Sequence, residues 1–126
     1  MADAPVADRP ERQPVPMAIS NEMVRIYKAY FGRGPTKART VFAGPDVVVC
    51  TLEDSFTPAE RHLVALGEHL RLAELRVFFQ RAAAAEFRKE VERLTGRTVW
   101  AFVSGTDTEQ DVSAEVFYLG PPAREA

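Results

Sequence analysis

The sequence predicts a single α+β domain in the order α-β-β-α-α-β-β, with a four-stranded antiparallel sheet covered by helices on one face. Three observations predict this class. The chain has 126 residues, 46% of them hydrophobic, which is enough for one core and short for two. Amphipathic stretches at helical spacing precede each of two pairs of apolar runs. Each pair is joined by a short polar turn, so hairpins form locally and the helices bury their apolar stripes on the sheet.

The first helix is predicted to begin at Ser20 and to end at Gly32. Ser20 can cap the following amides, with Ile19 before it and Val24 after it placed as a hydrophobic staple. Gly32 can take the left-handed conformation that ends a helix, and Pro35 prevents the helix from resuming. Between these ends, apolar residues recur at spacings of three and four, at Met23, Ile26, Tyr27, Tyr30 and Phe31.

The sequence motifs in the middle of the chain predict a hairpin followed by two helices. KARTVFA and VVVCTLE flank the turn GPD and form the hairpin. TPAE, residues 57–60, is a capping box in which Thr57 and Glu60 can each bond the other's backbone amide. Gly67 interrupts this helix, and a longer one continues to Gly96. The long helix offers a set of residues for burial: Leu72, Leu75, Phe79, Ala82, Phe87, Val91 and Leu94.

The second hairpin consists of TVWAFVS and VSAEVFYL, joined by GTDTEQD. Four of its apolar residues fall at two-residue steps: Trp100, Phe102, Phe117 and Leu119. If they lie on the uncovered face of the sheet, they form the interface of a homodimer. The alternative is that they pack against the chain's own helices in the core.

The two ends of the chain are predicted to be tails. Residues 1–18 are rich in proline and mixed charges, so they cannot bury enough apolar surface to offset the entropy of ordering. They have neither the basic start nor the apolar run of a secretory signal. We expect a disordered tail over residues 1–18, the domain over residues 19–119, and a loose tail over residues 120–126.

Composition restricts the class of function. Sixteen Lys and Arg stand against eighteen Asp and Glu, so the net charge of −2 gives no global field to attract nucleic acid, and such binding would have to be local. The single Cys50 cannot form an intramolecular disulfide, which fits a reducing compartment. No stretch approaches the length of apolar sequence that spans a bilayer. We therefore expect a cytoplasmic protein that reaches a membrane only through a partner.

The strongest candidate site is the stretch YFGRGPTKART. Five cationic residues and no acidic one lie between positions 25 and 39. Two glycines let backbone amides approach a ligand, and the cations supply charge for a phosphate, carboxylate or bicarbonate. The predicted anion site comprises Gly32, Arg33, Gly34, Lys37 and Arg39.

Two other interpretations of this stretch stay open. In the first, Gly32 ends the helix, Pro35 turns the chain into the strand, and the cations are solvated. In the second, the cations bind an acidic protein or a nucleic acid, with Tyr27, Tyr30 and Phe31 able to stack on bases. The stretch lacks the spacing of a P-loop and does not follow a strand.

Other residue types of catalytic interest do not form a convincing centre. Glu53 and Asp54 are adjacent on a predicted strand and so point to opposite faces. His62 and His69 are seven positions apart, about 10.5 Å in rise on an unbroken helix, which is too far to share one ion. Cys50 stands in an apolar strand, so we expect a buried, inert thiol with no neighbouring base to activate it. We predict no catalytic residue, no metal site and no cofactor.

Several of these motifs together resemble a known family. The segments ISNEMVRIYKAYFGRGPTKAR, VVVCTLED, TPAER and FRKEVERLTGR, followed by two strands, are similar to the small bacterial MpsC-like domain over residues 19–119. That family is named after a proposed sodium-translocating, membrane-potential-generating system linked to bicarbonate uptake. The resemblance implies an accessory domain with no established catalytic residues.

These observations predict a non-enzymatic binding or regulatory domain that acts beside a membrane ion or bicarbonate system. We expect a homodimer, with a membrane protein as a further partner. The first alternative is a sensor that binds a small anion between Gly32 and Arg39. The second is a nucleic-acid-binding regulator that uses the same cations.

Overall fold

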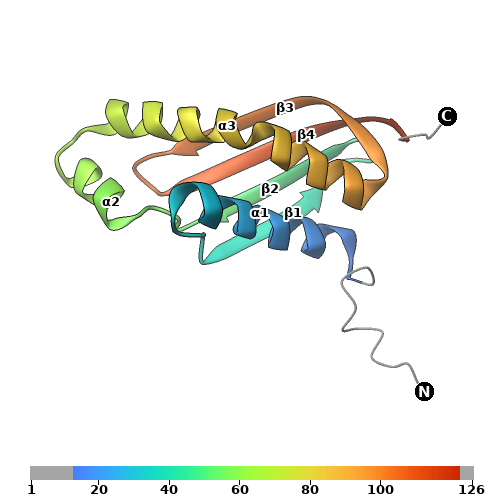
Figure 1. The fold of residues 1–126 in the computed structure, drawn as a ribbon, viewed down its shortest axis with the longest axis horizontal. Coiled ribbons are helices and arrows are strands. Elements are labelled where there is room, and N and C mark those ends of the chain that lie inside the picture. Colours follow the sequence, from blue (N-terminus) through green and yellow to red (C-terminus); the bar gives the residue numbers. More distant parts are fainter. Residues whose placement is uncertain (1–12, 123–126) are drawn as a thin grey trace, which may run out of the picture.

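The computed structural model describes residues 13–122 and has the predicted α+β order. All four strands belong to one antiparallel sheet in the order β1-β2-β4-β3. Helices α1 and α3 run across one face of this sheet, and the short α2 lies beyond the end of the strands beside α3 (Figure 1). The elements are α1 (Val15–Phe31), β1 (Lys37–Phe42), β2 (Val47–Glu53), α2 (Pro58–Ala65), α3 (His69–Thr95), β3 (Arg97–Asp107) and β4 (Val112–Pro122).

Helix α1 begins at Val15, so the predicted start at Ser20 is wrong. Residues 15–18, which we assigned to the tail, form the first turn of the helix. Proline is compatible with the start of a helix, because the first amides have no helical partner to lose, and Pro14 and Pro16 occupy this start. Ser20 is buried inside the helix and shares a 2.8 Å hydrogen bond with the hydroxyl of Thr40 on β1. The rest of the predicted N-terminal tail, residues 1–12, lies outside the described residues.

The C-terminal boundary is also later than predicted. Strand β4 continues to Pro122, and Arg97 at the start of β3 pairs with Pro122 in register. Residues 120–122 therefore belong to the sheet rather than to a loose tail, while residues 123–126 lie outside the described part of the chain.

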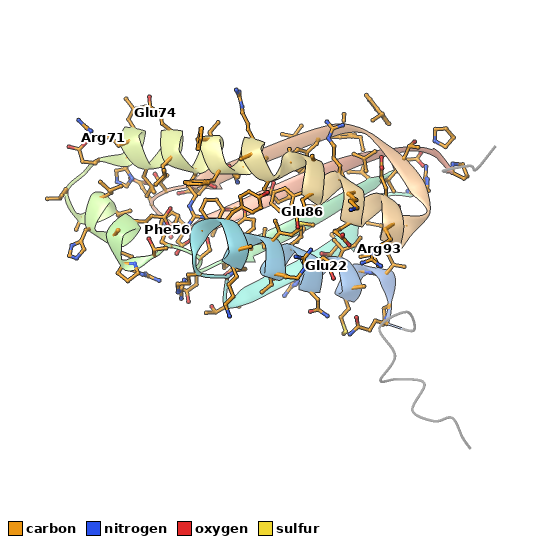
Figure 2. All side chains as sticks on the ribbon, viewed as in Figure 1. Glu22, Phe56, Arg71, Glu74, Glu86 and Arg93 are labelled. Carbon is orange, nitrogen blue, oxygen red and sulfur yellow. The ribbon has the colours of Figure 1, made fainter. Side chains whose placement is uncertain are left out.

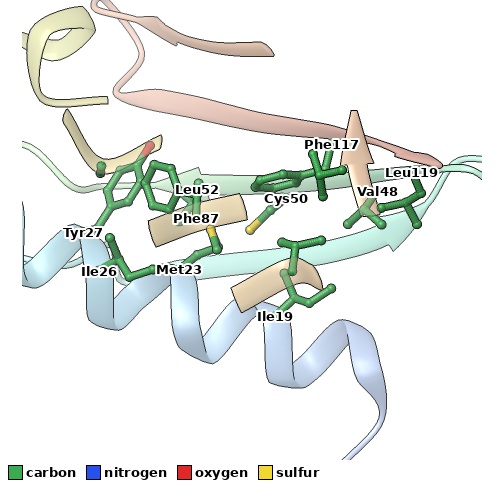
Figure 3. Close-up of a cluster of buried hydrophobic side chains, with 13 residues drawn as sticks. Ile19, Met23, Ile26, Tyr27, Val48, Cys50, Leu52, Phe87, Phe117 and Leu119 are labelled. Atoms are coloured by element: carbon green, nitrogen blue, oxygen red, sulfur yellow. The ribbon is translucent and has the colours of Figure 1, made fainter. Parts of the chain in front are cut away.

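The core lies between the sheet and two helices. Alternate residues of β2 and β4 point toward α1 and α3, as the two-residue period of a strand requires. Tyr27 on α1, Phe87 on α3 and Phe117 on β4 are fully buried in this layer (Figure 3). The full set of buried core residues is Ile19, Met23, Ile26, Tyr27, Val48, Cys50, Leu52, Ala83, Phe87, Val91, Val99, Phe117 and Leu119.

The buried stripe of α3 differs from the predicted one. Leu75 is 38% exposed and Ala82 is exposed, although both were expected in the core. Arg76 and Gln80 are buried instead. The apolar spacing of the sequence therefore predicted the helix correctly but misplaced part of its buried face, because two polar residues find partners inside the domain.

The four residues predicted as a dimer interface do not share a face. Phe117 and Leu119 are buried, and Phe102 packs against the same core. Trp100 is 68% exposed and contacts the ring of Tyr118 instead. The pairing of β3 with β4 shifts between Val99 and Ala101, and such an irregularity reverses the alternation of side chains along a strand. The alternative, burial against the chain's own helices, is correct for three of the four residues.

The uncovered side of the sheet is nevertheless apolar, through other residues. We call this side the outer sheet face. Val41, Val49, Val116 and Val103 are paired in register across all four strands and form a continuous row. Val41 and Val103, at the two edges, are 48% and 56% exposed. A second row continues the apolar surface with Val47, Tyr118 and Ala101.

Helix α2 begins at the predicted capping box. Thr57 Oγ1 accepts a 3.2 Å hydrogen bond from the Glu60 amide, and the Thr57 amide donates a 2.9 Å bond to the Glu60 carboxylate. Gly67 has φ +75°, a conformation that favours glycine, and it separates α2 from α3 as predicted.

Replacing the cap residue tests how far α2 depends on it. We expect Thr57→Ala to lower the free energy of unfolding by about 1 kcal/mol, because the Glu60 amide loses its acceptor. Thr57→Ser keeps the hydroxyl and serves as the control. Urea unfolding monitored by circular dichroism measures both, and equal midpoints for the Ala and Ser variants would contradict the role of the cap.

Candidate functional site

The motif segments of the sequence converge at one end of the domain, where the turn after β2 meets α2 and the β3–β4 turn. Arg33 Nη1 donates to the backbone carbonyls of Asp54 at 2.6 Å and Phe56 at 3.2 Å. The Asp54 carboxylate accepts from Thr36 at 2.8 Å and from Arg61 at 2.5 Å. We call this group, with Asp111 described below, the motif junction. It joins the GRGP, LED and TPAE segments through side chains that are far apart in the sequence.

Two aspartates hold the junction in an uncommon backbone conformation. Asp54 and Asp111 have φ values of +61° and +55°, the left-handed region that Asp tolerates better than most residues. The Asp54 amide donates to the Asp111 carbonyl at 3.1 Å, and the Asp111 carboxylate accepts from the amides of Ser55 and Phe56, both at 3.0 Å. Hydrogen bonds from Thr36, Arg61 and Arg33 lower the pKa of the exposed Asp54 carboxyl. These contacts lock the turn after β2 onto the β3–β4 turn.

The structure separates the five residues of the predicted anion site. Gly32 has φ +84° and its amide bonds to the Lys28 carbonyl, so it ends α1. A Cβ on Gly34 would lie 3.3 Å from Val24, so this glycine allows the chain to pass close to α1.

The three cations also have different surroundings. Arg33 faces backbone carbonyls in the motif junction, and Lys37 pairs with Glu53 at 3.8 Å. Arg39 lies on edge strand β1 and makes no ion pair within residues 13–122. This arrangement favours the interpretation of the stretch as a helix stop and a turn, and anion binding stays a prediction.

Beside the motif junction, Arg76 is completely buried and was not identified as a functional residue from the sequence. Its guanidinium bonds to both carboxylate oxygens of Glu60, at 2.8 and 2.6 Å, and to the Ser55 hydroxyl and carbonyl at 3.2 and 3.1 Å. It also lies 3.9 Å from the centroid of the Phe31 ring and 4.8 Å from that of Phe56. Sequence spacing cannot find this contact, because its partners lie at the end of α1 and between Ser55 and Glu60.

A second buried polar cluster surrounds Glu115 on β4. Its Oε2 accepts from the Tyr27 hydroxyl at 2.5 Å and from Gln80 Nε2 at 3.1 Å. Its Oε1 has no hydrogen-bond partner among the described residues, and neither has the hydroxyl of Ser104, which is paired with Glu115 across the strands. Burial raises the pKa of Glu115 to about 7, and burial together with the Glu115 charge raises the pKa of Tyr27. The cluster holds a carboxyl that changes its protonation near neutral pH.

The remaining candidate residues make ordinary structural contacts. Cys50 is buried, as predicted, and burial raises the pKa of its thiol to about 11. His62 lies on α2, whereas His69 lies on α3 and shares a 2.8 Å hydrogen bond with Thr108. Within residues 13–122, no group of three or more His, Cys, Asp or Glu side chains is arranged to hold a metal ion.

These features define a small α+β domain in which the buried charged side chains Arg76, Glu60 and Glu115 form hydrogen bonds with other residues of the same chain. A family model described as the Na+-translocating membrane potential-generating system (MpsC) matches residues 12–120. The chain belongs to this family. No curated protein and no solved structure matches it. In the described part of the chain, no helix has both the length and the apolar character needed to cross a membrane.

The two arginines of the cationic stretch should differ in their effect on stability. We expect Arg33→Gln to lower the free energy of unfolding by about 1–3 kcal/mol, because two carbonyls of the motif junction lose a charged donor. Arg39→Gln should change it by less than about 0.5 kcal/mol, since Arg39 has no such partner. Chemical denaturation of the two variants compares them directly, and equal effects would contradict the structural role of Arg33.

Stability should also depend on pH through Glu115. Its folded pKa of about 7 exceeds the ordinary value of 4.5, so the folded state holds more protons than the unfolded state between these values. The free energy of unfolding should therefore fall as pH rises through this window, with a slope approaching about 1.4 kcal/mol per pH unit.

Glu115→Gln should flatten this dependence, because an amide does not ionise. Glu109→Gln, at an exposed position in the β3–β4 turn, is the control and should keep the slope of the wild type. Urea unfolding across the window measures all three proteins. An unchanged slope in Glu115→Gln would show that another group is responsible.

Proposed function

We propose that this domain is a non-catalytic binding module that docks through its outer sheet face on a partner protein of a membrane sodium system. The family description supplies the system, which generates a membrane potential by moving Na+. The docking surface and the absence of a catalytic role are our own inferences. In this proposal the domain stays on the cytoplasmic side and reaches the membrane through that partner.

The observation that carries the proposal is the uncovered row of valines across the sheet. Helices α1 and α3 occupy the other side, so Val41, Val49, Val116 and Val103 have no cover within residues 13–122 (Figure 1). Tyr118 and Trp100 extend this surface along β4 and β3. A contiguous apolar surface on a folded domain typically marks a site of interaction.

The charges around the outer sheet face favour a protein partner over a lipid surface or a nucleic acid. At the end of the sheet away from Trp100, one row contains Lys37, Glu53 and Asp107, and the next row contains Arg39. Lipid headgroups and nucleic acids select clustered Lys and Arg, which this mixed row lacks. An apolar centre with a rim of both signs is the composition of a protein–protein interface.

The contacts of the ionisable groups support a non-catalytic role. Arg76 and Glu60 satisfy each other in the interior, and Arg33, Asp54 and Asp111 are used to hold the turns. Catalytic groups need access to a substrate as well as a tuned pKa. Among these residues, the buried pair has no access and the junction residues are engaged with one another.

Photo-crosslinking in cells tests the docking surface. A photoreactive amino acid at Val41, on the outer sheet face, should capture an integral membrane protein of the sodium system, whereas the same group at Leu66 should not. Leu66 is the matched control because it is 73% exposed and apolar but lies at the end of α2. Adducts from Val41 that contain only proteins outside the membrane would contradict the proposal.

A substitution provides a second measurement of the same surface. Val41→Asp should release the domain from the membrane fraction, since a charge would be buried in the interface, while Leu66→Asp should leave it bound. Both positions are exposed in the isolated domain, so both variants should fold. Retention of Val41→Asp in the membrane fraction would exclude this edge of the face from the contact.

A further inference from the structure

Helix α3 carries a second apolar surface, separate from the outer sheet face. Phe78 is 65% exposed and Val77 is 42% exposed on the side of the helix that turns away from the core. They share a shallow surface depression with four neighbours on the same helix. We call this set the α3 patch, and its members are Ala73, Glu74, Val77, Phe78, Arg81 and Ala82.

The two charged residues of the α3 patch have no partner within the described chain. Neither Glu74 nor Arg81 takes part in an ion pair or a side-chain hydrogen bond within residues 13–122, unlike Arg71 and Arg93 on the same helix. Figure 2 shows Glu74 pointing away from the body of the domain. The two are seven positions apart, about 10.5 Å along the helix, so they cannot reach each other. Each therefore offers an unmatched charge at the edge of an apolar surface.

The order of residues in the α3 patch is self-complementary. If two copies of α3 run antiparallel about a two-fold axis that crosses between Val77 and Phe78, each of the four central members of the set lies level with another member of the set. Val77 meets Phe78 of the second copy at the centre, and Glu74 meets Arg81 of the second copy one turn away. A two-fold interface requires this kind of self-matching surface.

From this symmetry we propose that a second copy of the chain binds the α3 patch, as an antiparallel pair of α3 helices. The charges select this occupant, because a second copy supplies an Arg for each Glu74 and a Glu for each Arg81. They also select the orientation, since a parallel pair in register would place Glu74 against Glu74. Antiparallel helices additionally oppose their macrodipoles. The homodimer predicted from the sequence thus uses α3, and the outer sheet face stays free.

A charge exchange tests this arrangement directly. Glu74→Arg alone and Arg81→Glu alone each create two like-charged contacts across the axis, and each should raise the Kd of the dimer at least about tenfold. The double variant Glu74→Arg/Arg81→Glu restores opposite charges in the same places, and its Kd should return to within about threefold of the wild type. Sedimentation velocity of the full chain up to high micromolar concentration measures all four proteins. Recovery in the double variant cannot come from a damaged fold.

Two further variants complete the experiment. Phe78→Ser should weaken the dimer by removing its central contact, while Lys89→Glu, an exposed charge near the other end of α3, should leave it unchanged. A wild type that is monomeric throughout this concentration range would overturn the proposal, as would a double variant as weak as the single ones. Dissociation by Val41→Asp but not by the α3 variants would also overturn it, by placing the self-association on the outer sheet face. Because the surfaces differ, failure here leaves the proposed function unaffected.

Discussion

The buried ion pair between Arg76 and Glu60 is the contact on which the arrangement of the helices depends. Removing a guanidinium and a carboxylate from water costs several kcal/mol per ion, and only good geometry offsets this. Here the pair is bidentate, Ser55 satisfies further donors, and the rings of Phe31 and Phe56 cover the cation. Because Glu60 also closes the capping box of α2, one carboxylate fixes the start of that helix and its distance from α3.

This pair also explains why the motif residues meet at one place. Ser55 lies in the turn after β2, and its amide donates to the carboxylate of Asp111 in the β3–β4 turn. Arg33 donates to the carbonyl of Phe56, the residue after Ser55. The end of α1, the end of β2 and the start of α2 are thus tied to one another by side chains with defined partners. The GRGP, LED and TPAE segments therefore build one interconnected end of the domain.

The two apolar surfaces are compatible with two partners at once. The α3 patch belongs to the helical layer, and the valine row belongs to the opposite side of the sheet. A pair of domains joined through α3 would carry two outer sheet faces, so that each pair could engage two copies of a partner. Linking two binding sites in this way raises the overall affinity without any new contact, provided that the partner's geometry allows both to bind.

Local signals in the sequence determined the order of the elements, the capping box of α2, the stop at Gly32, the break at Gly67 and the burial of Cys50. Each depends on a few neighbouring residues, whose backbone preferences or spacing carry the information. Tertiary structure alone decided which side of α3 is buried and which residues form the outer sheet face. Arg76 and Gln80 enter the interior only because Glu60, Ser55 and Glu115 are brought to them from other segments. Trp100 leaves the core because the pairing of β3 with β4 shifts beside it, and a strand's own alternation does not encode that shift.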